Sequence, residues 1–199
     1  MVKAVKVEEY ALVLDFLPRG KSSSYKSEPI AQVLGTEYFT LLEVVPKEGV
    51  TFKAGEKVYV GKEERDKIDF IKKRISFSEL TANSSAEIEK MIEKLVLEQA
   101  EKFVGFFNNA QSISLKRHQL ELLPGLGKKH MVEILGEREK QQFKSFDDIE
   151  KRVHLMPNPV RLVVKRIMEE LEGDLDKHFL FVRPPAVEKP FRREFRRRE

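Results

Sequence analysis

The residue types that point most clearly to chemistry lie between positions 122 and 130, which read Leu-Leu-Pro-Gly-Leu-Gly-Lys-Lys-His. Glycine permits positive φ and has no Cβ, so Gly125 and Gly127 would let a ligand approach the backbone closely. A helix that starts here offers free N–H groups and the positive end of its dipole, which favour an anion. We therefore predict a phosphate-binding turn made of Gly125, Leu126, Gly127, Lys128, Lys129 and His130.

Apolar residues on both sides of this turn recur at helical spacing. Proline lacks a backbone N–H and fixes φ, so Pro124 marks the break between the two helical segments. The sequence thus predicts two helices joined by a tight turn. The residues expected on their inner faces are Leu115, Leu120, Leu122 and Leu123 before the turn, and Met131, Ile134 and Leu135 after it.

This pattern resembles the helix-hairpin-helix motif of DNA- and RNA-binding proteins, in which the hairpin amides hold a backbone phosphate. The resemblance also implies that a monovalent cation, K⁺ or Na⁺, is held by the carbonyls of Glu121, Leu123 and Leu126. One position departs from the family, because Met131 stands where a small alanine usually lies at the helix–helix contact. A Pro-Gly turn in a helical hairpin with no ligand is the alternative interpretation.

A second stretch, residues 155–168, aligns without gaps on residues 122–135 at an offset of 33. Pro157 aligns with Pro124, but both hairpin glycines are missing from this copy. Paired hairpins of this motif pack about a pseudo-twofold axis, so we expect the degenerate copy to supply core contacts. It retains Asn158, a residue type that tolerates positive φ, and three cations within reach of a phosphate: Arg161, Lys165 and Arg166.

Two segments outside the hairpin combine cations with aromatic side chains. Cations neutralise phosphates and aromatic rings stack on unpaired bases, so both segments fit single-stranded nucleic acid. For each of them, an ordinary solvated surface is the alternative. The residues concerned are Arg19, Lys21, Tyr25 and Lys26 in a polar loop, and Phe191, Arg192, Arg193, Phe195, Arg196, Arg197 and Arg198 near the C-terminus.

The formal net charge of +4 is concentrated at the C-terminus. Residues 183–199 contain seven basic and three acidic side chains, whereas the preceding residues contain 30 of each. The preceding part is therefore neutral on average, and a basic face within it requires local segregation of charge. The proline-rich start and high polarity of residues 183–199 predict a disordered basic tail.

One pair of residues resembles a catalytic site. In helix-hairpin-helix DNA glycosylases a hairpin lysine is the nucleophile and an aspartate follows about 18 residues later, as Asp147 follows Lys129. We do not adopt this function, because Asp147 lies in a helix-capping sequence and too few helices remain for a base-flipping pocket. The four histidines lack metal spacing, and there is no cysteine or glycine-rich nucleotide loop. We expect no catalytic activity and no cofactor beyond the monovalent cation.

Short strands at regular spacing fill the N-terminal part of the sequence. We expect them at residues 10–17, 30–34, 38–45 and 52–61, and we expect a helical turn before a last strand near residues 74–80. Five strands of this kind suggest a small barrel of the oligonucleotide-binding type. The fold class predicted is therefore α+β, with this barrel followed by a helical domain of paired helix-hairpin-helix motifs.

The helical part should begin after a linker at residues 81–85, where Ser84 and Glu87 form a capping box. A long helix then continues to Asn108 and Asn109, and a later helix starts at Ser145 or Asp147. The predicted domains are residues 1–82 for the barrel, 83–182 for the helical domain with its hairpins at 122–135 and 155–168, and 183–199 for the tail.

As a whole, the sequence resembles an archaeal family of unknown function whose members are described as predicted RNA-binding proteins. No apolar stretch reaches the about 20 residues needed to span a bilayer, so we expect a cytoplasmic protein with no membrane partner. The function expected is non-catalytic nucleic-acid binding, with RNA preferred over DNA. The alternative is an adaptor whose paired hairpins dock a protein partner, and the oligomeric state stays open.

Overall fold

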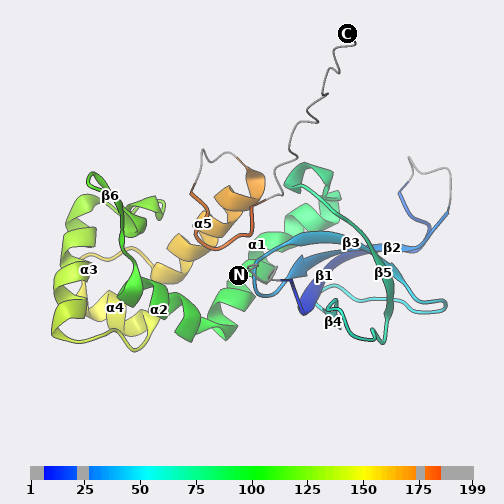
Figure 1. Ribbon diagram of the computed structural model, residues 1–199, viewed down its shortest axis with the longest axis horizontal. Coiled ribbons are helices and arrows are strands. Elements are labelled where there is room, and N and C mark those ends of the chain that lie inside the picture. The colour runs from blue at the N-terminus through cyan, green and yellow to red at the C-terminus, as the bar shows by residue number, and fades with distance from the viewer. Residues whose placement is uncertain (1–6, 22–26, 174–177, 185–199) are drawn as a thin grey trace, which may run out of the picture.

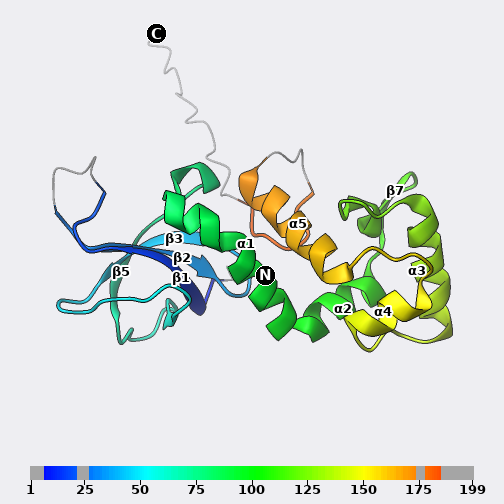
Figure 2. The same cartoon turned by 180° about the vertical axis from the view of Figure 1, so that it is seen from behind.

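The structure is a computed structural model that describes residues 7–21, 27–173 and 178–184. It is a mixed α+β fold with a curled antiparallel sheet at one end and a group of helices at the other (Figure 1). The long helix α1 (Ala82–Glu98) lies against the sheet and leads towards the helical end, as the view from behind also shows (Figure 2).

The sheet contains five strands in the order β4-β1-β2-β3-β5. Every pairing is antiparallel, and β1 to β4 follow the 4-1-2-3 order of a Greek key, with β5 added beside β3. The prediction for the first strand is confirmed residue by residue, and those for the next two are confirmed to within a few positions. The strands are β1 (Tyr10–Leu17), β2 (Ile30–Gly35), β3 (Leu41–Pro46), β4 (Lys57–Tyr59) and β5 (Ile68–Arg74).

Both faces of the sheet are apolar over most of their area, and β2 and β3 are buried along their whole length. Alternate residues divide between two clusters: Val13 and Val33 face the inside of the curl, whereas Leu12 and Leu34 join the cluster formed with the helices. This hydrophobic cluster is continuous from the sheet to the helices, and it crosses the domain boundary expected at residue 82.

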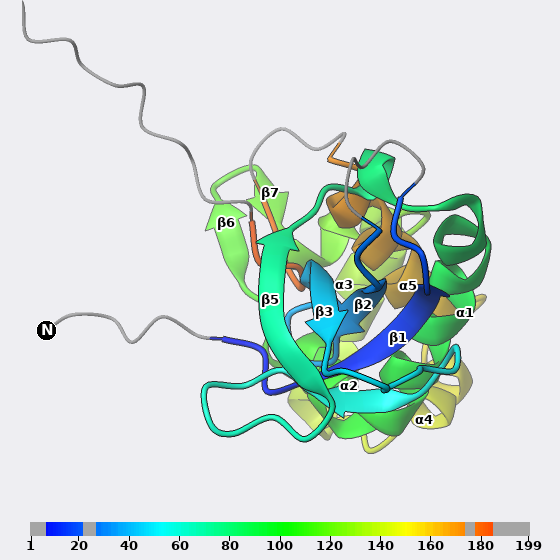
Figure 3. The same cartoon turned by 90° about the vertical axis from the view of Figure 1, so that its right-hand side faces the viewer.

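The sheet curls into a half-barrel and does not close into the barrel that the sequence suggested (Figure 3). The edge strands β4 and β5 are not paired with each other. After β4, the amides of Val60 and Gly61 donate hydrogen bonds to the carbonyl of Glu9 at 2.8 and 3.2 Å, so the chain keeps following β1. The chain after β4 therefore stays beside β1, and β4 and β5 are the two edge strands of an open sheet.

The order of elements before α1 is the reverse of the prediction. The strand β5 precedes the helical turn. Ile68 and Ile71 of β5 pair with Pro46 and Val44 and pack inside the curl, which fixes this stretch as a strand. The helical turn follows as the 3₁₀ helix η1 (Phe77–Glu79). The apolar residues between Ile68 and Phe77 fit both strand and helix spacing, so the sequence did not predict that the strand precedes the helical turn.

The helix α1 starts earlier than predicted, since its N-cap is Thr81, whose side chain accepts a hydrogen bond from the Ser84 amide. The expected long helix also breaks at Gln99, which lies at φ −109° and ψ 33°. The side chain of Gln99 donates a 2.8 Å hydrogen bond to the carbonyl of Thr36, which ties the break to the β2–β3 turn. The next helix is α2 (Ala100–Asn109), which ends where the sequence predicted.

The remaining elements form the helical end of the molecule. They are a two-stranded hairpin of β6 (Ser112–Ser114) and β7 (Arg117–His118), the 3₁₀ helix η2 (Gln119–Leu122), and the helices α3 (Lys128–Lys140), α4 (Phe146–Arg152) and α5 (Pro159–Glu172).

Residues 178–184 return from α5 to the sheet. Phe181 stacks edge-on against Phe103 and Phe106 of α2, with ring centroids 5.4 and 5.0 Å apart. The amide of Arg183 donates to the Tyr38 carbonyl at 3.1 Å, and Arg74 at the end of β5 donates to the carbonyls of Arg183 and Pro184. This segment therefore connects the helical end to two places on the sheet.

The carboxylate of Glu79 closes the turn after β5, and its titration gives a testable prediction. It accepts hydrogen bonds from Lys73 and from the Ser76 amide, which lower the pKa of Glu79 from 4.5 to about 2. The Glu79 carboxyl has a lower pKa in the folded protein than in the unfolded chain. Its ionised form therefore stabilises the folded protein at a pH above the unfolded-chain pKa, and this stabilisation is lost as the pH falls to the folded-state pKa.

We therefore expect wild-type protein to be more stable than Glu79→Gln by about 1 kcal/mol or less at neutral pH, since the pair with Lys73 is partly exposed. The difference in the free energy of unfolding should shrink between about pH 5 and about pH 2. Urea titrations of both proteins across this range measure it, and a difference that stays constant would contradict the assignment.

Candidate nucleic-acid interface

The turn predicted to bind phosphate links η2 to α3. Gly125 has φ +90°, the left-handed value that the sequence suggested, and its neighbour Leu126 is buried. The amide of Leu126 donates to the Leu123 carbonyl at 3.1 Å, which closes the turn. Gly127 has extended backbone, with φ −82° and ψ 168°, and a Cβ placed there would meet nothing within 4 Å. The chain therefore leaves open space in front of Gly127.

The start of α3 has no side-chain cap, which it shares with α2, whose N-cap Gln99 also makes no side-chain hydrogen bond. Helices α1, α4 and α5 begin with side-chain caps from Thr81, Ser145 and Asn158, which accept hydrogen bonds from first-turn amides. Helix α3 begins at Gly127, which has no side chain to do so, and its first turn contains no acidic residue. The N–H groups of its first turn can therefore donate to a ligand, and the exposed Lys128 and Lys129 lie beside them.

The helix predicted upstream of the turn is absent. Residues 112–118 form the β6–β7 hairpin, with Leu115 fully exposed at its tip, and only the four residues of η2 are helical. The side chain of His118 accepts a hydrogen bond from the Leu120 amide and so begins η2 with its own cap. Leu120, Leu122 and Leu123 are buried as expected. A compact 3₁₀ turn is therefore enough to bury these three leucines, and their sequence spacing does not require an α-helix.

The second copy is a helix-turn-helix of α4 and α5, but its backbone differs from that of the first. The N-cap of α5 is Asn158, whereas the residue aligned with the Gly127 N-cap is Val160. Asn158, which could have adopted positive φ, has φ −50°, and the left-handed residue of this turn is Leu155, at φ +50°. His130 lies 3.1 Å from the Leu155 carbonyl through its Nε2, so the two turns touch.

The sequence left Arg166 able to reach a phosphate, but the structure places it in the interior. Its Nε donates to Glu170 at 2.8 Å, and its guanidinium also donates to the carbonyls of Leu122 and His178. Both charged residues are buried, with 4% and 3% of their surface exposed. Because Leu122 ends η2, Arg166 fixes the entry to the phosphate-binding turn.

Two other arginines that the sequence analysis did not single out hold helix ends. Arg138 donates to the carbonyls of Phe107 and Ala110 at the end of α2, at 3.0 and 2.9 Å. Arg152 donates to the carbonyls of Glu137 and Gln141 at the end of α3. Burial lowers the pKa of Arg138, which nevertheless stays charged. The only sequence signal for such roles is a charged residue on an apolar helix face.

The exposed cations near the two turns are Lys128, Lys129, Arg161 and Lys165. They sit in the first two turns of α3 and α5, so the two helix starts share one sign of charge. The carbonyls proposed for a monovalent cation lie in η2 and the turn, and that of Leu123 already accepts the Leu126 amide. The cation stays a prediction.

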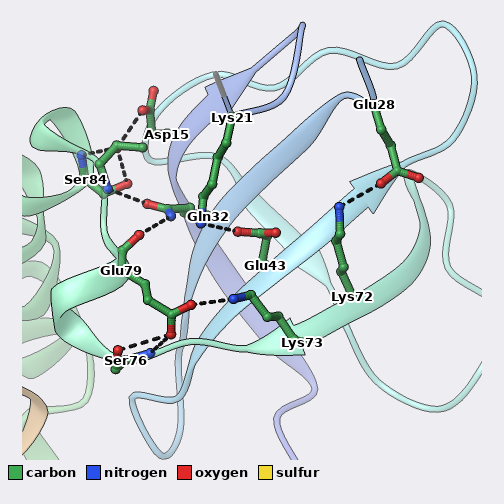
Figure 4. Close-up of polar contacts among 11 residues, drawn as sticks. Asp15, Lys21, Glu28, Gln32, Glu43, Lys72, Lys73, Ser76, Glu79 and Ser84 are labelled. Atoms are coloured by element: carbon green, nitrogen blue, oxygen red, sulfur yellow. Dashed lines mark hydrogen bonds and ion pairs between the residues drawn. The ribbon is translucent and has the colours of Figure 1, made fainter. Parts of the chain in front are cut away.

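The other predicted contacts fall partly outside the described residues. This applies to Tyr25 and Lys26 in the loop, and to all seven tail residues from Phe191 to Arg198. Arg19 is exposed, but Lys21 forms a 2.6 Å ion pair with the buried Glu43 on β3 (Figure 4). Lys21 is therefore part of a polar site on the sheet and not a free loop cation.

Lys129 and Asp147, the pair considered for catalysis, are both exposed, and Asp147 lies in the first turn of α4 behind the Ser145 cap. Among the residues that the structure describes, no group of three histidine or acidic side chains is arranged to hold a metal ion. None of the helices in this part of the chain is long and apolar enough to cross a membrane.

The fold and the turn define a protein with a half-barrel joined to a helical end, and comparison with known proteins assigns its family. The model of a family described as "Protein of unknown function (DUF655)" matches residues 7–183. The uncharacterized protein MJ0038 of Methanocaldococcus jannaschii is 44% identical over 182 residues, which cover 91% of this chain and 82% of that protein. The chain therefore belongs to the DUF655 family.

A solved structure supports the same assignment. The crystal structure of Af1531 from Archaeoglobus fulgidus, which carries the same family designation, aligns with a TM-score of 0.81 at 42% identity. It covers 88% of this chain and 100% of that chain. The predicted membership of an uncharacterised archaeal family is thus confirmed, while RNA binding stays a prediction.

The two hairpin glycines should respond differently to alanine. Gly125→Ala forces a Cβ into a left-handed conformation and should lower the free energy of unfolding by about 1 kcal/mol or more. Gly127→Ala adds a methyl group in open space at an ordinary φ, so its effect should stay within about 0.5 kcal/mol. Urea unfolding of both variants tests this, and equal destabilisation by the two would show that the turn is described wrongly.

Proposed function

We propose that this protein binds nucleic acid without catalysis and holds a backbone phosphate at the turn formed by residues 125–130. The observation that carries the proposal is the start of α3, where Gly127 offers neither a capping side chain nor a Cβ in front of the first amides. An anion there would receive hydrogen bonds from the backbone and the favourable end of the helix dipole.

The turn is suited to fixing position more than to supplying affinity. An anion at a helix start gains about 0.3–1 kcal/mol from the dipole, which is little beside the attraction of several cations. Lys128 and Lys129 on α3 and Arg161 and Lys165 on α5 add charge around the same place. We also propose that the sheet is related to an oligonucleotide-binding barrel and that the turn is a helix-hairpin-helix turn.

We favour RNA over double-stranded DNA because the basic tail places Phe191 and Phe195 among arginines, a composition suited to unpaired bases. A second candidate function is a protein adaptor. It is favoured by three exposed apolar residues at the helical end: Leu115, Val132 and Leu155. Binding that weakens steeply with salt supports nucleic acid, whereas salt-insensitive binding of a protein supports the adaptor.

Alanine in place of Gly127 provides the direct test of the proposed phosphate site. The added methyl group keeps a phosphate from the first amides of α3, so affinity for RNA should fall roughly tenfold. Gly136→Ala is the matched control, because it makes the same change in the same helix at a position that also faces open space. Its affinity should stay within about twofold of wild type, since Gly136 lies far along α3 from the first amides.

Fluorescence anisotropy measures the affinity of both variants for single- and double-stranded RNA, and circular dichroism checks that both variants are folded. If the two variants bind with equal affinity, the turn is structural and the proposed phosphate site is wrong.

The tail should supply the salt dependence of binding. A deletion of residues 185–199 keeps Arg183 and Pro184, which Arg74 holds against the sheet, and removes six basic residues from the sequence. Each phosphate that the protein no longer neutralises lowers the slope of log affinity against log salt by about 0.7–0.9, so the slope should fall by several units. An unchanged slope in the truncated protein would place the basic groups that meet the phosphates on the folded part.

A further inference from the structure

A polar cavity lies on the outer face of the sheet, away from the hairpin. Its volume is about 290 Å³, and it is lined by Gly20, Lys21, Glu28, Ile30, Glu43, Lys72 and Lys73. Ligand sites for drug-sized molecules begin at about 300 Å³, so this cavity suits a single small ring system. Figure 4 shows that the charged side chains of this region form three separate pairs: Lys21 with Glu43, Lys72 with Glu28, and Lys73 with Glu79.

The strand register explains why polar residues meet there. Asp15, Gln32, Glu43 and Lys73 are successive cross-strand partners and form one row across β1, β2, β3 and β5. Their neighbours Val33 and Val44 point into the curl, so this row points out. Gln32 is fully buried and is held by the Glu79 carbonyl and the Thr81 amide at the start of α1. The row is therefore a fixed floor and not a set of free surface side chains.

Glu43 is the least satisfied member of the row. Only 4% of its side-chain surface is exposed, and its Oε2 accepts no well-directed hydrogen bond from any described residue, although Lys21 Nζ lies 2.6 Å away. Burying a carboxylate is costly unless it is both paired and hydrogen-bonded. The ion pair supplies charge compensation, and because Glu43 Oε2 is buried beneath Lys21 Nζ, a ligand N–H donor reaches this oxygen only when the Lys21 ammonium moves aside.

The lysines around the cavity do not form a phosphate-binding site. Lys72 pairs with Glu28 at 2.8 Å, and Lys73 pairs with Glu79, so each cation already faces a carboxylate. These two pairs are partly exposed and contribute little stability. The cavity is close to neutral, which favours an uncharged group that presents donors to Glu43 and an acceptor to a lysine.

We propose that this cavity binds an unpaired guanine base, an inference that extends the proposed RNA binding to a specific base. The Watson–Crick edge of guanine carries two adjacent donors, N1–H and the N2 amino group, followed by the O6 acceptor. The Glu43 carboxylate matches the donors, and the ammonium group of Lys21 beside it matches O6. Adenine and cytosine place an acceptor beside their amino group, which the carboxylate would repel.

A neighbouring base has a stacking surface on the same face. Phe70 pairs with Val45, next to the inward-facing pair of Ile71 with Val44, so Phe70 points outward like Lys73. The residue is 43% exposed, so a face of its ring is accessible to a ligand. Base–aromatic stacking there would position the nucleotide that precedes or follows the guanine.

Guanosine and inosine monophosphate test the proposal on wild-type protein, because inosine lacks only the N2 amino group. We expect guanosine monophosphate to shift the NMR amide signals of Glu43 and Lys73 and to bind about tenfold more tightly than inosine monophosphate. Equal binding of the two nucleotides, or no shift at these amides, overturns the inference. The phosphate of either nucleotide can also bind the hairpin turn, so the affinities are taken from the shifts of the Glu43 and Lys73 amides, which report on the cavity independently of Gly127→Ala.

Glu43→Gln supplies the second arm, with Glu48→Gln as the control that removes one carboxylate from an exposed turn. In a uridine heptamer with one central guanosine or inosine, Glu43→Gln should lose the preference for guanosine, and Glu48→Gln should keep it. A preference that survives in folded Glu43→Gln overturns the inference. Heptamer binding with no such preference in wild type leaves the proposed function standing and refutes the guanine site alone.

Discussion

The buried ion pair between Arg166 and Glu170 holds together the parts of the chain that matter most for the proposed function. Besides Arg166, the carboxylate of Glu170 accepts the amides of Leu180, Phe181 and Val182 at 2.7–2.9 Å. Arg166 in turn donates to the carbonyls of Leu122 and His178. One pair of side chains on α5 thus joins the end of η2 to the segment that returns to the sheet.

Such a pair fixes geometry more than it adds stability. Desolvation of two buried charges offsets most of their attraction, but removal of one partner leaves the other uncompensated at a cost of about 3–5 kcal/mol. Apart from an ion pair of Arg166 with Glu169 at 3.8 Å, the other contacts of the pair end on backbone atoms, so the constraint passes directly to the chain. Leu162 lies close to Gly125 from the same helix, and together these contacts set where the turn before α3 lies.

The amino-acid sequence contains enough information for the parts of the fold that are local. Alternating and continuous apolar runs located β1, β2 and β3. One of the two N-caps considered for the later helix, Ser145, is the cap of α4, and the glycine at 125 indicated a left-handed turn. The long-range parts were not predictable. The spacing of the leucines from Leu115 to Leu123 fits a helix, yet Leu115 is fully exposed at the tip of a β-hairpin. Helical spacing alone cannot separate these two cases.

The candidate site shows the same division. The glycines and lysines of the turn are where the sequence placed them, because a turn depends on neighbours in the chain. Besides its local partner Glu170, Arg166 donates to Leu122, 44 residues away, and Lys21 pairs with Glu43, 22 residues away. Nothing in their local sequence distinguishes them from cations free to meet a phosphate. The structure turns the first into a scaffold residue and the second into part of a polar cavity.

The most direct test of the phosphate-binding turn is an NMR titration of ¹⁵N-labelled full-length protein with a short single-stranded RNA. If the turn holds a backbone phosphate, the amide signals of Lys128, Lys129 and His130 should shift most as the RNA is added, because their N–H groups would donate to it. Saturable binding that leaves these three amides unshifted would contradict the account.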